Sequence, residues 1–203
     1  MIHKGKRMTG GAPHSPYSIH GLGKLFADRI KGSVEDWNEL RVLDVGTGSA
    51  ANAIFLAELV GIRGKVYSID PSKEVLQNAG KTIKAKGLSK RIKLSEGEAE
   101  NIPLESSFFD VVVTLMALHH LKSLGKAIKE FGRVLEEKGV FVAVEWTTKA
   151  SEFIPHPKTD FISPELAKKL LVENGFDITD FEESGYYFFI KAQKRKNEEA
   201  EVR

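Results

Sequence analysis

The chain has 203 residues, and its 30 Lys and Arg against 28 Asp and Glu give a formal net charge of +2. Hydrophobic residues make up 41% of it, which is enough for a core and excludes a wholly disordered chain. Cysteine is absent, which excludes disulfides, thiolate metal sites and a cysteine nucleophile. A charge so close to balance is not typical of a dedicated nucleic-acid-binding protein.

The length predicts one domain with short appendages. Glycine and proline interrupt the first 24 residues, so we expect either a loose arm or a lid over a site, followed by a helix near 22–30. We divide the chain into an N-terminal arm and helix at 1–38, a cofactor-binding domain at 39–194 and a frayed charged tail at 195–203. No apolar run approaches the roughly 18 residues that span a membrane, and no apolar segment follows the basic N-terminus, so we expect a cytoplasmic protein without a membrane partner.

Strands and helices alternate from residue 40 onward. Short apolar runs predict strands at 41–45, 65–69, 91–95, 109–114 and 139–145, and the segments between them predict helices at 50–60, 71–86 and 123–135. Ser163-Pro164-Glu165 starts a further helix that ends at Gly175. Two last strands, at 177–183 and 186–192, are joined by Ser184-Gly185 as a hairpin. The pattern predicts an α/β fold with a doubly wound, mostly parallel, seven-stranded sheet and a C-terminal antiparallel hairpin.

A glycine-rich turn lies between the first strand and the next helix. Gly46-Thr47-Gly48-Ser49-Ala50-Ala51 satisfies the pattern G-x-G-x-x-[GA], which lets the backbone approach a nucleotide closely. Asp70, at the end of the second strand, lies 24 residues after Gly46, near the spacing of a carboxylate that accepts hydrogen bonds from ribose hydroxyls. The alternative is that Asp70 caps the helix beginning at Pro71 and Ser72.

Asp44 distinguishes between two classes of nucleotide cofactor. It stands two residues before Gly46, where the pyrophosphate of a dinucleotide would rest, and a carboxylate beside that doubly charged group would cost several kcal/mol. S-adenosylmethionine carries no phosphate but an ammonium and a sulfonium, so Asp44 favours it. A structural role for Asp44, accepting hydrogen bonds from loop amides, is the alternative.

Several separate stretches resemble the class I S-adenosylmethionine-dependent methyltransferases, most closely their ubiquinone/menaquinone-type small-molecule branch. The stretches are 42–50, with Ala50 in place of the usual third glycine, 68–70 at the ribose-binding strand end, 96–103 after the third strand, 108–113 in the fourth strand and 133–139 before the fifth. The resemblance is specific from about 40 to 145 and looser as far as 194. It implies a Rossmann-like fold.

The same resemblance implies the cofactor residues. They are Asp44, Gly46, Gly48, Asp70, Glu98, Ala99 and Leu115, with S-adenosyl-L-methionine as the cofactor. Glu98 would contact the adenine amine, where the family more often has Asp, and Leu115 would touch the cofactor through backbone or apolar contact. Packing in the core is the alternative for Leu115.

Methyl transfer is an in-line displacement, so holding the two reactants in line supplies much of the rate, up to roughly 7–11 kcal/mol of the barrier. A general base is needed only when the acceptor must lose a proton. His119 and His120 are the candidates, and because they are adjacent we expect at most one to face the acceptor; a packed or capping histidine is the alternative.

The acceptor side is expected to combine the N-terminal arm with residues 145–164. Candidate substrate contacts are Tyr17, His20, Glu145 and Trp146, although Glu145 could equally form a salt bridge and Trp146 a core wall. A metal site drawing on His14, His20, His119 and His120 has no ligand-like spacing with carboxylates, so none is expected.

The function predicted is methyl transfer from S-adenosylmethionine to a small-molecule acceptor, with release of S-adenosylhomocysteine. No Asn/Asp-Pro-Pro-Tyr/Phe segment is present, the covalent route through cysteine is closed, and an appended RNA-binding module does not fit the length. Three alternatives stay open: an NAD(P)-dependent oxidoreductase, a non-catalytic cofactor-binding protein and an RNA methyltransferase. A nucleic-acid partner is not expected, and a homodimer is compatible with the sequence.

Overall fold

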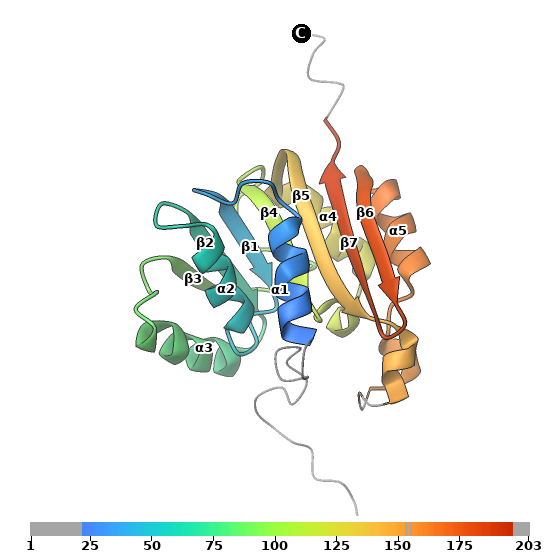
Figure 1. The fold of residues 1–203 in the computed structure, drawn as a ribbon, viewed down its shortest axis with the longest axis horizontal. Coiled ribbons are helices and arrows are strands. Elements are labelled where there is room, and N and C mark those ends of the chain that lie inside the picture. Colours follow the sequence, from blue (N-terminus) through green and yellow to red (C-terminus); the bar gives the residue numbers. More distant parts are fainter. Residues whose placement is uncertain (1–21, 153, 155, 197–203) are drawn as a thin grey trace, which may run out of the picture.

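A central sheet of seven strands organises the residues that the computed structural model describes, which are 22–152, 154 and 156–196. The strands follow the order β3-β2-β1-β4-β5-β7-β6, with β1 and β4 adjacent in the middle (Figure 1). The predicted fold class, a mostly parallel α/β sheet with a C-terminal antiparallel hairpin, is confirmed.

Five parallel strands form most of the sheet. They are β1 (Arg41–Val45), β2 (Lys65–Asp70), β3 (Ile92–Glu96), β4 (Phe109–Leu115) and β5 (Leu135–Trp146). The hairpin of β6 (Phe176–Ser184) and β7 (Tyr187–Lys194) completes it, with β7 antiparallel to both β5 and β6. The carboxyl ends of the parallel strands therefore lie at one edge of the sheet.

Helices cover both faces of the sheet. They are α1 (Leu22–Gly32), α2 (Ala51–Leu59), α3 (Lys73–Ala85), α4 (Leu124–Val134) and α5 (Pro164–Glu173). Ser72, Ser123 and Ser163 cap the starts of α3, α4 and α5, each accepting a hydrogen bond from the backbone N–H three residues later. None of the helices in the described part of the chain is long and apolar enough to cross a membrane.

The two faces have separate cores. On one face α1, α2 and α3 pack over alternate strand residues such as Val42, Val111 and Val142, and on the other α4 and α5 pack over Val112 and Phe141. Helix α1 is part of the first core: Phe26 is fully buried and lies edge-on to the rings of Trp146 and Tyr187. The described part of the N-terminal unit that we separated at 1–38 is thus packed onto the sheet.

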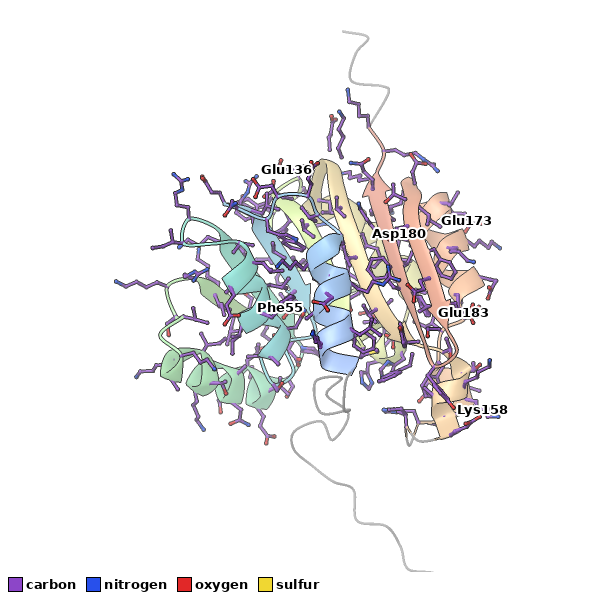
Figure 2. All side chains as sticks on the ribbon, in the orientation of Figure 1. Phe55, Glu136, Lys158, Glu173, Asp180 and Glu183 are labelled. Atoms are coloured by element: carbon purple, nitrogen blue, oxygen red, sulfur yellow. The ribbon has the colours of Figure 1, made fainter. Side chains whose placement is uncertain are left out.

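Strand β6 forms one edge of the sheet and is rich in carboxylates. The acidic residues are Asp177, Asp180, Glu182 and Glu183. Figure 2 shows Asp180 and Glu183 on this strand, with Glu173 on the neighbouring helix. The pairing with β7 also shifts register between Ile178 and Asp180. Charge and a register irregularity are both features that discourage an exposed strand from pairing with another chain.

Candidate functional site

A cavity of about 290 Å³ lies at the carboxyl ends of β1, β2 and β3 and beside the chain that follows β4. We call it the cofactor cavity. Open α/β sheets bind ligands where the strand order reverses, which here is between β1 and β4. Four residues that the sequence predicted for the cofactor line the cavity together: Gly46, Asp70, Glu98 and Ala99.

The glycine turn packs tightly against the chain that follows β4. Gly46 has φ +94°, and a Cβ there would lie 2.8 Å from the Cβ of Ala117. The N–H groups of Gly46 and Thr47 both donate to the carbonyl of Ile69, at 3.0 and 3.1 Å. Only glycine combines this conformation with so close an approach. The two hydrogen bonds to Ile69 hold the turn against β2, and Gly46 lines the cavity.

Asp44 lies beneath the turn and not on the cavity wall. Its carboxylate is fully buried and accepts hydrogen bonds from Asn52 Nδ2 and Ser68 Oγ, each at 2.6 Å. The Ser68 hydroxyl is also 2.7 Å from the hydroxyl of Thr47. Burial raises the pKa of Asp44 to about 6, although the bonds from Ser68 and Asn52 lower it. The structural alternative considered for Asp44 therefore has direct support, while a contact with the cofactor stays a prediction.

Asp70 stands at the cavity wall where β2 ends. One carboxylate oxygen accepts from the N–H of Gly48 at 3.3 Å, and the other accepts from the N–H of Ser72 at 2.9 Å. The helix cap itself is Ser72, whose hydroxyl accepts from the N–H of Val75 at 3.2 Å. Asp70 thus ties the glycine turn to the start of α3, at the position expected of a ribose-binding carboxylate.

Glu98 and Ala99 come from the loop after β3. The carboxylate of Glu98 forms an ion pair with Lys122, and both side chains are exposed. Glu100 accepts hydrogen bonds from the backbone N–H groups of Lys122 and Ser123, at 2.7 and 3.0 Å. These contacts join the loop after β3 to the chain after β4 across the cavity. Ala117 and Lys122 also line the cavity, and sequence reasoning missed them because neither belongs to a recognisable pattern.

Among the described residues, five of those predicted for the cofactor or the substrate do not line this cavity: Asp44, Gly48, Leu115, Glu145 and Trp146. Leu115 is half-buried and packs against the core of the first face, which is the alternative considered for it. Trp146 is 1% exposed and packs against Phe26, so it is a core wall and does not present a surface to a substrate. Gly48 is exposed beside the cavity. Tyr17 and His20 lie outside the described residues.

Glu145 is placed differently from a residue that contacts substrate. It is fully buried, and its carboxylate accepts from the backbone N–H groups of Leu118 at 2.6 Å, His119 at 3.2 Å and Trp146 at 2.7 Å. The second oxygen also lies 2.7 Å from Nδ1 of His119. Four hydrogen bonds within the protein occupy this carboxylate, so its role is to hold the chain after β4 and the ring of His119.

Three imidazoles gather beside the cofactor cavity, and we call them the histidine cluster: His119, His120 and His156. The ring centroids of His119 and His120 are 4.0 Å apart, and each lies 5.2 Å from that of His156. His120 lines the cavity and His119 does not, which agrees with the expectation that at most one of these adjacent histidines faces the acceptor. Burial and the neighbouring His119 and His156 lower the pKa of His120 to about 4. His156 was missed because nothing in its local sequence marks it.

Comparison with known proteins agrees with this geometry. Residues 43–143 match the model of a family described as a methyltransferase domain. A demethylmenaquinone methyltransferase of Geobacillus kaustophilus (strain HTA426) is 37% identical over 105 residues, which are 52% of this chain and 44% of that protein. The uncharacterized methyltransferase YcgJ of Bacillus subtilis (strain 168) is 31% identical over 107 residues, which are 53% of this chain and 41% of that protein. In both relatives the matched part is less than half of the protein.

A solved structure extends the likeness over most of the fold. The crystal structure of a SAM-dependent methyltransferase from Aquifex aeolicus has a TM-score of 0.74 and 25% sequence identity, and the match covers 82% of this chain and 87% of that one.

The switch-point cavity, the glycine turn and the carboxylate that ends β2 together define a Rossmann-like domain that binds a nucleoside cofactor. The chain belongs to the class I S-adenosylmethionine-dependent methyltransferases, and its cofactor is S-adenosyl-L-methionine.

Proposed function

We propose that this protein transfers the methyl group of S-adenosylmethionine to a small-molecule acceptor by in-line displacement and releases S-adenosylhomocysteine. The observation that carries the proposal is the cofactor cavity, where Gly46, Asp70, Glu98 and Ala99 meet at the switch between β1 and β4. Asp70 accepts hydrogen bonds from the ribose hydroxyls and Glu98 contacts the adenine amine. Gly46 and Gly48 let the backbone approach the cofactor.

The acceptor site lies on the side of the histidine cluster. We propose His119 and His120 as the candidates for a general base that takes a proton from the acceptor. Glu145 positions His119 through the 2.7 Å hydrogen bond. Relatives named demethylmenaquinone methyltransferases support a hydroxylated ring compound, so reduced demethylmenaquinone is the first acceptor to test. The cytoplasmic location and the homodimer remain predictions from the sequence.

The relatives do not favour an NAD(P)-dependent oxidoreductase or an RNA methyltransferase. A cofactor-binding protein without turnover is separated from an enzyme by measuring S-adenosylhomocysteine release with and without the acceptor. Release that depends on the acceptor supports an enzyme. Binding of the cofactor without release for any small-molecule acceptor would contradict the proposed transfer.

Ligand-induced thermal stabilisation is the first prediction. At about a hundred times its dissociation constant, S-adenosylmethionine or S-adenosylhomocysteine should add about 2.7 kcal/mol to the free energy of unfolding. For a domain of this size that raises the Tm by roughly 5–11 °C. NADH at the same concentration serves as the control and should give no shift. A shift with NADH alone would overturn the cofactor assignment.

Replacement of Asp70 by Ala tests the ribose contact. The loss of a charge-assisted hydrogen bond should cost about 1.5–3 kcal/mol of cofactor binding, which is a weakening of roughly 10- to 150-fold measured by calorimetric titration. Glu96→Ala is the matched control, because Glu96 pairs with Asp70 in register at the end of β3 but is exposed and ion-paired with Lys73. We expect Glu96→Ala to bind normally. An affinity of Asp70→Ala within about twofold of wild type would contradict the assignment.

A further inference from the structure

The chain contains six histidines, and three of them meet at one point of the fold. His119 and His120 come from the 3-10 turn after β4, and His156 from the segment between β5 and α5. One ring nitrogen from each lies within 4.8 Å of the other two. The cluster is graded in burial, since His119 is buried, His156 is half-buried and His120 is exposed. Two segments distant in sequence thus present three imidazoles to one small volume.

A buried carboxylate fixes the ring of His119. Glu145 Oε1 lies 2.7 Å from Nδ1 of His119, and three backbone N–H groups hold the same carboxylate in place. With Nδ1 at hydrogen-bond distance from Glu145, Nε2 is the nitrogen of His119 left for a metal ion. Histidines that bind metals in proteins almost always donate their other ring N–H to such a carboxylate or carbonyl, which sets the tautomer and orients the ring.

We propose that His119, His120 and His156 form a three-histidine site for a divalent transition metal of the Zn²⁺ class, beside the cofactor cavity. Imidazole nitrogens suit zinc and its neighbours in the first transition row. Three protein ligands leave one tetrahedral position open, as in catalytic rather than structural zinc sites.

The geometry needs only a small closure to accept the ion. Zinc–nitrogen bonds of about 2.0–2.1 Å in a tetrahedron place the ligand nitrogens about 3.3 Å apart. The nitrogens here lie within 4.8 Å of one another, so binding the ion requires them to approach by up to about 1.5 Å while Glu145 holds the ring of His119.

The site deepens the proposed function and rests on it for its role in the reaction. Because His120 lines the cofactor cavity, an acceptor bound at the open metal position would lie next to the methyl donor. The acceptor class it selects is a phenolic or enolic hydroxyl, whose proton a bound metal makes easier to remove. That proton leaves to solvent, the ring carbon next to the resulting oxyanion forms the new bond to the methyl carbon, and the methyl–sulfur bond breaks with its electron pair remaining on sulfur. The hydrogen of that ring carbon then moves as a proton to the oxygen, which restores the aromatic hydroxyl compound.

The test measures metal binding directly, with no cofactor or acceptor present. The full-length, tag-free protein is titrated with Zn²⁺ in competition with a chromophoric chelator and, separately, with Co²⁺ while its visible absorption is recorded. We expect one ion per chain and Co²⁺ bands of a four- or five-coordinate site. His156→Ala should weaken Zn²⁺ binding by more than the roughly 10- to 100-fold that loss of an outer partner causes. His120→Ala, at an exposed position, should do the same and serves as the second variant.

The other three histidines provide the matched control. The triple variant His3→Ala/His14→Ala/His20→Ala removes the same number of imidazoles and should leave the affinity and the Co²⁺ spectrum unchanged. Thermal unfolding of each metal-free variant checks its folding. The inference is overturned if wild type binds Zn²⁺ no better than His156→Ala and His120→Ala, or if the triple variant alone loses binding. Because stabilisation by S-adenosylmethionine is measured separately in chelator, failure here leaves the methyltransferase proposal standing.

Discussion

Replacing Glu145 by Ala is expected to lower the free energy of unfolding by at least about 3 kcal/mol, since each buried donor left without an acceptor costs about 1–3 kcal/mol. The reason is that Leu118, His119 and Trp146 would each be left with a buried N–H that has lost its acceptor, and the His119 ring would lose its own. Urea unfolding at pH 7 measures the change. Partial loss of structure in the chain after β4 would accompany it.

Glu136→Ala is the control for this experiment. Glu136 lies on the same strand, β5, but at the surface, where it is ion-paired with Arg41 (Figure 2). Such exposed pairs contribute about 0–1 kcal/mol, so this variant should unfold almost as wild type does. If both variants lost the same stability, the hydrogen bonds of Glu145 would not be the cause.

Asp44→Asn is expected to gain stability over wild type as the pH rises. The folded pKa of Asp44 is raised by burial from 3.8 to about 6, so the folded protein holds this proton more tightly than the unfolded chain. The free energy of unfolding of wild type therefore falls as the pH rises from about 4 to about 6, and it stops falling once Asp44 has lost its proton in the folded protein. Asn does not titrate. One unit of pKa shift is worth about 1.4 kcal/mol, so the difference between variant and wild type should grow by about 2 kcal/mol between pH 4 and pH 7.

Chemical denaturation of both proteins without cofactor, at a series of pH values, measures this difference. His120, whose pKa is lowered to about 4, titrates across part of the same range. It is present in both proteins and cancels in the comparison. A difference that stays constant from pH 4 to pH 7 would show that the folded protein does not bind a proton at Asp44.

Most of the sheet could be predicted because each strand carries its own local signal. Apolar runs between turn residues place β1, β2 and β4 within about one residue of their bounds. The start of β5 could not be placed in this way. The structure begins the strand at Leu135 instead of Gly139, because Leu135 pairs with Phe109 before a shift in register restores pairing at Val140. The intervening charged residues, 136–138, hide that continuity in the sequence.

The residues of the candidate site also divide into those that have a local sequence signal and those that do not. Gly46, Asp70 and Glu98 lie at or just after the ends of strands, so a motif and a spacing are enough to bring them to one cavity. The partnership of Glu145 with His119 and the arrival of His156 depend on packing between segments far apart in the chain. No local pattern encodes such contacts. Asp44 shows the converse, since the motif placed it in the predicted cofactor site while its burial beneath the turn emerged only from the fold.

The acidic edge of β6 limits how molecules of this protein can associate. A second chain adding a strand there would have to bring its backbone alongside Asp180 and Glu183 and remove their carboxylates from water. Two copies meeting edge to edge would bring like charges together as well. Growth of the sheet from one molecule into the next is therefore disfavoured on this side.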